Sequence, residues 1–157
     1  YKKFEYLLTN ILQKPIKKQE LSELLSNFSK EVKQALLVCE VATDIKELRD
    51  KTRNTKWLIV SGGDQAELRE VFKQRNLDGY FDGGIFGSPD DKDTILKNEM
   101  DTLNITGRCL FLGDSMYDYQ AAITAQMNFV FISQWTEVVD WEDKFTNNTR
   151  PNLSSLL

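Results

Sequence analysis

The chain of 157 residues is long enough for one domain of ordinary size with a small appendage, and its hydrophobic share of 41% suffices for a packed core. Its formal charge of −4 argues against a nucleic-acid-binding protein, which would usually carry a basic face. It contains no histidine, which excludes histidine-based triads, metal sites and general bases.

Residues 1–37 are predicted to be helical, because apolar side chains recur there at the spacing of one helix face. Pro15 ends the first of these helices, and a second one follows it. The chain opens with Tyr1, rather than Met, inside this pattern, so we expect a further segment to precede it in the intact protein. The apolar positions are Phe4, Leu7, Leu8, Ile11 and Leu12, and then Leu21, Leu24, Leu25 and Phe28.

After residue 37 the pattern changes to short apolar runs that alternate with helical stripes. Strands that alternate with helices of about ten residues form βα units and a parallel sheet. The chain is therefore predicted to be an α/β protein whose residues 38–157 form a three-layer, Rossmann-like core around a parallel sheet. The predicted strands are residues 57–60, 85–86, 109–113 and 129–132, and those at 57–60 and 109–113 are predicted to be buried.

Two helix starts are predicted from capping pairs, Asp44 with Glu47 and Asp64 with Glu67. The tail after Trp141 is rich in Asn and Thr and is predicted to be a loosely packed loop.

Cys39 and Cys109 lie in apolar runs and are predicted to be buried free thiols. The sequence shows neither a disulfide framework nor a zinc spacing. It also shows no signal peptide and no run long enough to span a membrane. We therefore expect a cytoplasmic protein without a membrane or nucleic-acid partner.

The stretch LFLGDSMYD has the clearest functional pattern in the chain. Its apolar run stops at a glycine and is followed by Asp114 and Asp118, and open α/β sheets bind ligands at such carboxyl ends of strands. Carboxylates suit Mg²⁺, so Asp114 is predicted to bind the cation directly. Asp118 is predicted to join through water or to orient Lys92 by a charge-assisted hydrogen bond. The alternative is an N-cap and a first-turn acid that only stabilise a helix.

Ser61 follows another predicted strand and precedes Gly62 and Gly63. The glycines allow close backbone approach, and free N–H groups at a helix start favour a phosphate. Ser61 and the Gly62 amide are therefore predicted to bind phosphate oxygens. The alternative is a tight turn followed by a helix cap.

Lys92 opens a predicted helix, where the helix dipole disfavours a cation. This position indicates a specific anionic partner for its ammonium group. The alternative is an ordinary exposed lysine.

Taken in order, these segments resemble the haloacid dehalogenase-like superfamily of phosphohydrolases. WLIVSGG is similar to its second motif, GSPDDK to its third and LFLGDSMYD to its fourth. The resemblance implies that Ser61 and Lys92 are catalytic residues that bind phosphate together with Gly62. It also implies that Asp114 and Asp118 supply the Mg²⁺ ligands.

The opening helices, residues 1–37, resemble the end of the helical cap in the subgroup that contains phosphoglycolate phosphatase and β-phosphoglucomutase. The family's first motif, an apolar strand that ends in Asp-x-Asp, has no match in the chain. In the family its first Asp attacks phosphorus and its second is the acid/base, and the strand lies centrally, between the strands of Ser61 and Asp114. We expect the intact protein to carry it within about fifty further residues, or, less favourably, a second chain to supply it.

The resemblance implies a Mg²⁺-dependent phosphatase that acts on a small phosphorylated metabolite through an aspartyl-phosphate. A phosphomutase of the same superfamily and a non-catalytic phosphate-binding or interaction module are the alternatives. A dehalogenase is less favoured, because it needs no cation and would leave the two acids idle. The 157-residue chain alone is expected to be inactive.

Overall fold

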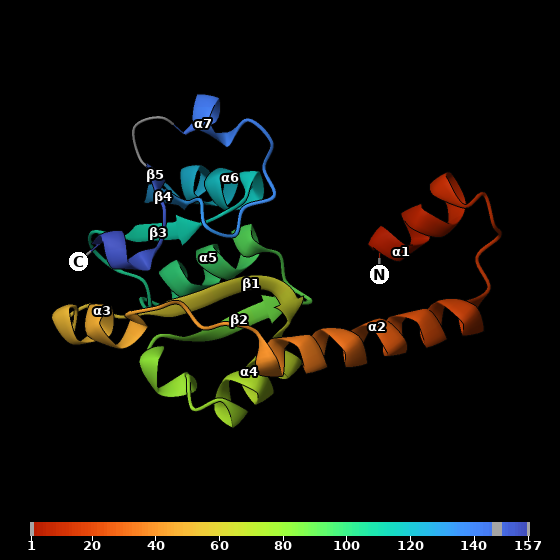
Figure 1. The fold of residues 1–157 in the computed structure, drawn as a ribbon, viewed down its shortest axis with the longest axis horizontal. Helices are drawn as coiled ribbons and strands as arrows, with labels where there is room; N and C mark the ends of the chain where they lie inside the picture. Colours follow the sequence, from red (N-terminus) through yellow and green to blue (C-terminus); the bar gives the residue numbers. More distant parts are fainter. Residues whose placement is uncertain (1, 146–148, 157) are drawn as a thin grey trace. The chain divides into compact units, whose positions relative to one another are not determined.

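The computed structural model describes residues 2–145 and 149–156 and confirms the predicted α/β class (Figure 1). Contacts between residues divide the chain into two compact units, Tyr1–Cys39 and Glu40–Leu157. None of the helices in the described part of the chain combines the length and apolar character that crossing a bilayer requires.

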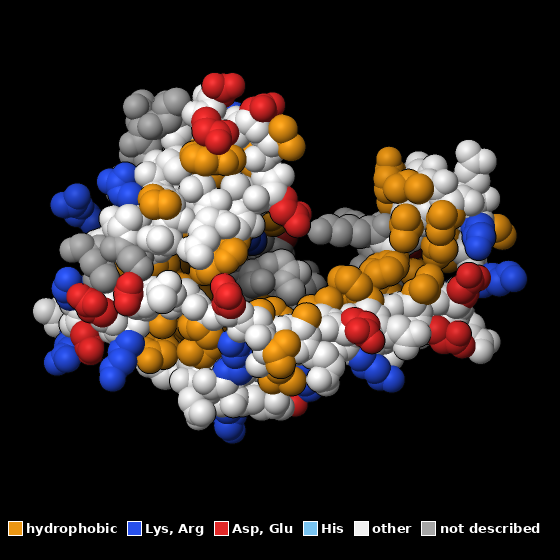
Figure 2. All heavy atoms as spheres, viewed as in Figure 1, with side chains coloured by type: hydrophobic (Ala, Val, Ile, Leu, Met, Phe, Trp, Pro, Cys, Tyr) orange, Lys and Arg blue, Asp and Glu red, His pale blue; other side chains and the backbone are white. Residues whose placement is uncertain are grey.

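The first unit is helical, as predicted. It comprises α1 (Lys2–Tyr6), the π-helix η1 (Leu7–Ile11) and α2 (Lys18–Val38). Leu8 and Leu21 are its buried side chains, and the rings of Phe4 and Phe28 pack edge to face with centroids 5.1 Å apart. Hydrophobic side chains also reach the surface of these helices (Figure 2).

The second unit alternates strands and helices in the predicted order. Each of the four predicted strands is present. The elements are α3 (Ile45–Lys51), β1 (Leu58–Asp64), α4 (Gln65–Gln74), η2 (Asp78–Tyr80), β2 (Gly84–Ser88), α5 (Lys92–Asp101), β3 (Leu110–Gly113), α6 (Met116–Thr124), β4 (Asn128–Ile132), α7 (Trp141–Lys144), β5 (Thr149–Arg150) and η3 (Leu153–Leu156).

The strands form two separate parallel sheets in the described residues (Figure 1). One sheet pairs β1 with β2, and the other has the order β3-β4-β5. Helix α5 packs on β1 and β2, α6 packs on β3 and β4, and the two helices contact each other. The two sheets are thus connected through the helix layer, and β1 and β3 each have one edge without a partner among the described strands.

The core of the second sheet includes the tail that was predicted to be a loose loop. Phe145 is buried and stacks on Phe131, with ring centroids 4.2 Å apart and an angle of 10° between the planes. Thr149 pairs with Phe131 in the short strand β5. The loop prediction is therefore wrong for α7 and β5, because a two-residue strand has no periodicity to detect. Residues 146–148 lie outside the described part.

Strand β3 is less buried than predicted. Leu110 and Leu112 are 55% and 36% exposed, whereas Phe111, on the other face, packs against the buried cluster of Phe129 and Phe131. Side chains of a strand alternate between its faces, and here only one face is well covered by described residues. An apolar run alone does not distinguish a strand buried on one face from a strand buried on both.

The prediction of two buried thiols is also wrong. Cys39 is exposed and Cys109 is partly exposed. Cys39 is the C-cap of α2 and thus stands at the end of its apolar stripe, and Cys109 precedes β3, where its Sγ lies 3.5 Å from the carbonyl oxygen of Gly107. Both cysteines lie at the ends of apolar elements, where burial falls off.

One of the two predicted helix caps is confirmed. The Asp64 carboxylate accepts a 3.0 Å hydrogen bond from the backbone N–H of Glu67 at the start of α4. Asp44 instead has a left-handed backbone (φ 63°), and its side chain makes no cap hydrogen bond to α3. An N-cap side chain needs an extended backbone to reach the next turn, which the left-handed conformation of Asp44 does not provide.

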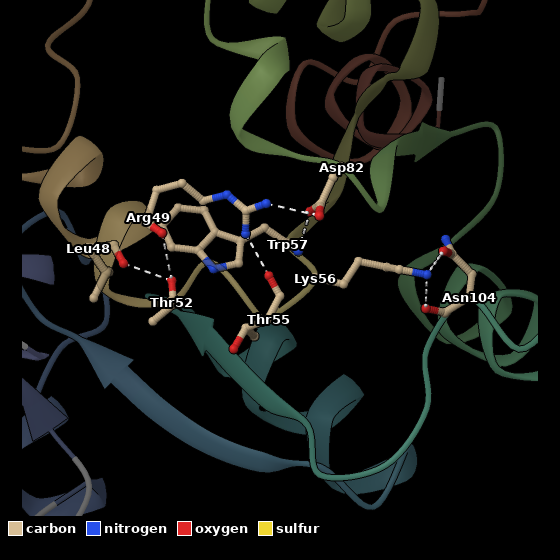
Figure 3. Close-up of polar contacts among 8 residues, drawn as sticks. All are labelled: Leu48, Arg49, Thr52, Thr55, Lys56, Trp57, Asp82 and Asn104. Atoms are coloured by element: carbon tan, nitrogen blue, oxygen red, sulfur yellow. Dashed lines mark hydrogen bonds and ion pairs between the residues drawn. The ribbon is translucent and has the colours of Figure 1, made fainter.

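At the start of β1, Arg49 ties α3 to the loop before β2 (Figure 3). Its guanidinium pairs with Asp82 at 2.9 Å, donates to the carbonyl of Thr55 at 2.6 Å and lies 5.4 Å from the centre of the Trp57 indole. Asp82 also accepts a 2.9 Å hydrogen bond from the Trp57 N–H. This N–H and the Arg49 charge hold the pKa of Asp82 below its ordinary value.

Candidate active site

The predicted acids lie where β3 ends and α6 begins. Asp114 directly follows β3, and the Ser115 hydroxyl caps α6 by accepting a 3.1 Å hydrogen bond from the Asp118 N–H. The same hydroxyl donates to Oδ2 of Asp118 at 2.6 Å. A Cβ atom on Gly113 would lie 2.3 Å from Cβ of Asp118, so only glycine lets Asp118 turn back against the end of the strand.

Lys92 is the first residue of α5, and its ammonium group forms an ion pair with Oδ1 of Asp118. Lys92 is 9% exposed and Asp118 is 6% exposed, so the pair is buried. A charged side chain is seldom buried unless it is paired with an opposite charge, as Lys92 and Asp118 are. The interpretation of Lys92 as an ordinary exposed lysine is therefore wrong.

Tyr117 adds two contacts to Lys92 that the sequence did not reveal. The Lys92 backbone N–H donates to the Tyr117 hydroxyl at 3.3 Å. The Lys92 ammonium nitrogen lies 5.4 Å from the centre of the Tyr117 ring, within the range of a cation–π interaction. Tyr117 and Met116 lie between Ser115 and Asp118, and neither of them has a role predicted from the sequence. No spacing or motif in the sequence indicates that Tyr117 contacts Lys92.

Asp114 lies beside this pair in a negative environment. Partial burial and the charge of Asp118 raise the pKa of Asp114, against the opposing effects of its own backbone N–H and of Lys92. A carboxylate whose charge is disfavoured in this way is stabilised by a nearby cation.

The segment after β4 holds Asp114 from the other side. The Thr136 hydroxyl donates to the Asp114 carbonyl at 2.5 Å and accepts from the Val138 N–H at 3.1 Å. A hollow of about 400 Å³ opens here, lined by Asp114, Ser115, Trp135, Glu137 and Val138. Asp114 therefore lies at the edge of this hollow.

The donor atoms distinguish the two predicted metal ligands. Asp114 offers carboxylate oxygens of the type that Mg²⁺ binds. Both oxygens of Asp118 are engaged, Oδ1 by Lys92 and Oδ2 by Ser115. In the described residues no three Asp, Glu, Cys or His side chains gather as a complete metal site. Asp114 thus fits a direct ligand, and the contacts of Asp118 fit the alternative in which it orients Lys92.

Ser61 lies in an irregular stretch of β1, beyond the regular pairing with β2. Its hydroxyl oxygen accepts a 3.1 Å hydrogen bond from the Gly63 N–H, which leaves the hydroxyl hydrogen available to a ligand. A Cβ atom on Gly62 would meet nothing within 4 Å. Ser61 and Gly62 therefore lie within β1, between the paired residues Val60 and Asp64, and Gly62 borders open space. The described hydrogen bonds do not join them to Lys92 or Asp114.

A comparison of the sequence with protein-family profiles agrees with this arrangement. The profile described as "Haloacid dehalogenase-like hydrolase" matches residues 2–132, which include all five predicted site residues. The chain belongs to the haloacid dehalogenase-like hydrolase family. No protein of curated function matches its sequence.

Solved structures of haloacid dehalogenase-like hydrolases share the fold. The structure of HAD hydrolase, family IA, variant 3, from Entamoeba histolytica aligns with a TM-score of 0.75 at 16% identity, over 96% of this chain and 73% of that chain. A haloacid dehalogenase-like family protein from Streptococcus pneumoniae aligns with a TM-score of 0.70 at 18% identity, over 95% and 74%. The chain thus spans about three quarters of these two relatives.

Proposed function

We propose that the intact protein is a Mg²⁺-dependent phosphohydrolase that acts on a small phosphorylated metabolite. The observation that carries this proposal is the buried Lys92–Asp118 pair beside Asp114. Phosphoryl transfer depends mainly on charge neutralisation and positioning. The ammonium group of Lys92 and a cation bound by Asp114 would both neutralise the negative charge of a phosphoryl group.

The proposed nucleophile is a carboxylate on a strand that pairs with both β1 and β3 in the intact protein. Two observations support its place: β1 and β3 each have an edge without a described partner, and all the described strands run parallel within their sheets. A strand there would present Asp-x-Asp at the same edge as Ser61 and Asp114. Its first carboxylate attacks the substrate phosphorus and displaces the ester oxygen of the substrate, which takes a proton from the second carboxyl group. Water then hydrolyses the aspartyl-phosphate to phosphate and the free carboxylate.

The residues of this chain have distinct roles in the proposal. Asp114 binds Mg²⁺, which when bound neutralises charge on the phosphoryl oxygens. Lys92, held by Asp118, binds a phosphoryl oxygen through its ammonium group. The Ser61 hydroxyl and the Gly62 amide donate hydrogen bonds to the remaining oxygens. Residues 1–37, as part of a helical cap, exclude water and contact the organic part of the substrate.

The test is the release of phosphate from a generic aryl phosphate by the full-length protein, with and without Mg²⁺. We expect Mg²⁺-dependent turnover, and an Asp114→Asn variant should lose at least about a hundredfold, because charge stabilisation of this kind contributes several kcal/mol. Asp101→Asn, which changes an exposed carboxylate at the end of α5, is the matched control and should retain full activity.

Two results would contradict the proposal. Equal turnover by the full-length protein and its Asp114→Asn variant would remove Asp114 from the metal site. Turnover by the 157-residue chain alone would show that the nucleophile lies among its own residues, since we expect this chain to be inactive.

A further inference from the structure

Tyr117 connects the first turns of two helices that follow strands of different sheets. Its own helix, α6, follows β3, and its hydroxyl accepts a hydrogen bond from the first backbone N–H of α5, that of Lys92. The first N–H groups of a helix have no partner within the helix, so an external acceptor fixes the position of that turn. Tyr117 therefore holds the backbone of Lys92.

The ring of Tyr117 also faces the charge of Lys92. The ammonium nitrogen lies 5.4 Å from the ring centre, while Oδ1 of Asp118 pairs with the same nitrogen. A cation–π contact does not use up an N–H donor of the ammonium group. An ammonium group has three donors, so pairing with Asp118 leaves others for a ligand.

We propose that Tyr117 is a positioning residue that holds the Lys92 ammonium group in place for a phosphoryl oxygen. It contacts Lys92 at two points, the backbone N–H and the ammonium group. This inference rests on the proposed function for the identity of the anion. The lysine side chain has four rotatable methylene units, and immobilising them costs conformational entropy. Contacts at the backbone and at the ammonium group together reduce the entropy that is lost when the anion binds.

The geometry is tested first, without reference to catalysis, by NMR of the protein and two variants. Tyr117→Phe removes the hydroxyl and keeps the ring, so the Lys92 amide should exchange about two- to tenfold faster, while the ring-current shift of the Lys92 ε-protons remains. Tyr117→Leu removes both contacts and should abolish that shift as well. Tyr117 is 47% exposed, so neither substitution removes a buried core side chain.

The functional part is tested by binding inorganic phosphate to the intact protein in the presence of Mg²⁺. Tyr117→Leu should weaken binding about two- to tenfold, and Tyr117→Phe should recover part of that loss. In a Lys92→Met background, Tyr117→Leu should have no further effect, because Tyr117 acts through Lys92. Met116→Leu is the matched control: Met116 opens the same helix, is 44% exposed and takes part in neither contact.

The outcomes separate the two claims. Unchanged Lys92 amide exchange and ε-proton shifts in Tyr117→Leu would overturn the positioning role, whatever the enzyme's activity. Equal effects of Tyr117→Leu with and without Lys92 would overturn it as well. If the two variants show the expected NMR changes but the wild-type protein binds no phosphate, the proposed function is contradicted and the contacts of Tyr117 remain established.

Discussion

The ammonium group of Lys92 pairs with the carboxylate of Asp118, 26 positions later in the sequence. The pair joins the first turn of α5 to the first turn of α6, and these helices follow strands of different sheets. It is therefore both a structural connection and the centre of the proposed site.

Breaking this pair should be costly for stability. Lys92→Met leaves the Asp118 carboxylate buried without its partner, and we expect a loss of about 3–5 kcal/mol in the free energy of unfolding. The double variant Lys92→Met/Asp118→Leu should recover part of that loss, because neither charge of the pair then remains buried. Chemical denaturation measures both effects.

The exposed pair of Lys51 and Glu47, within α3, provides the control. Lys51→Met should cost less than about 0.5 kcal/mol, because solvent screens the pair. Equal costs for Lys92→Met and Lys51→Met would contradict the importance of burial.

Gly113 should not tolerate a side chain. In Gly113→Ala the new Cβ would lie 2.3 Å from Cβ and 2.7 Å from Cγ of Asp118, so Asp118 must move away from Lys92. We expect a loss of about 1–3 kcal/mol from this overpacking, measured by chemical denaturation. Gly79→Ala is the control, because a Cβ atom there meets nothing within 4 Å. Equal stability of the two variants would show that the turn adapts.

The carboxylate of Asp82 should make stability depend on pH. Its pKa in the folded state lies below the ordinary value of 3.8, chiefly because it accepts the Trp57 N–H and also because it pairs with Arg49. It therefore contributes stability above its unfolded-state pKa, and this contribution is lost as the pH falls through the folded-state pKa. The difference in unfolding free energy between wild type and Asp82→Asn should thus be largest near neutral pH and shrink in acid.

Urea denaturation across this pH range measures the difference. Asp50→Asn, which alters an exposed pair with Arg53, is the control and should change the unfolding free energy by less than about 0.5 kcal/mol at neutral pH. A difference for Asp82→Asn that stays constant with pH would contradict the assigned shift.

The tail contributes to the core through Phe145. Phe145→Ala removes a buried ring that stacks on Phe131, and we expect it to cost about 3–5 kcal/mol. Val139→Ala, at a position that is 74% exposed, should cost little. Thermal denaturation compares the two variants, and a midpoint for Phe145→Ala equal to that of Val139→Ala would show that the tail does not stabilise the sheet.

The sequence predicts the parts of this structure that depend on local patterns. Short apolar runs indicate strands, and the residue just beyond such a run, Asp114, directly follows β3. Ser61 follows the apolar run of β1, but the strand continues past it to Asp64. Asp64 is predictable as a cap because the side chain and its partner are three residues apart.

Contacts between distant segments are not predictable in this way. Tyr117 and Thr136 reach Lys92 and Asp114 only because the fold brings their segments together, and no spacing in the sequence records this. The exposure of Leu110 depends on which elements cover its own face of β3, opposite the face of Phe111. The predicted cap at Asp44 is absent because capping depends on the backbone conformation of the residue as well as on its type, and Asp44 has a left-handed backbone.

The division of the strands into two sheets has a consequence for how the molecule unfolds locally. Within each sheet the backbone hydrogen bonds support one another, whereas in the described residues none runs from β1 to β3. Amide exchange should therefore report two separate opening units. A strand bonded along both edges would merge them into one cooperative unit, so that completing the sheet and assembling the reaction centre would become a single folding event.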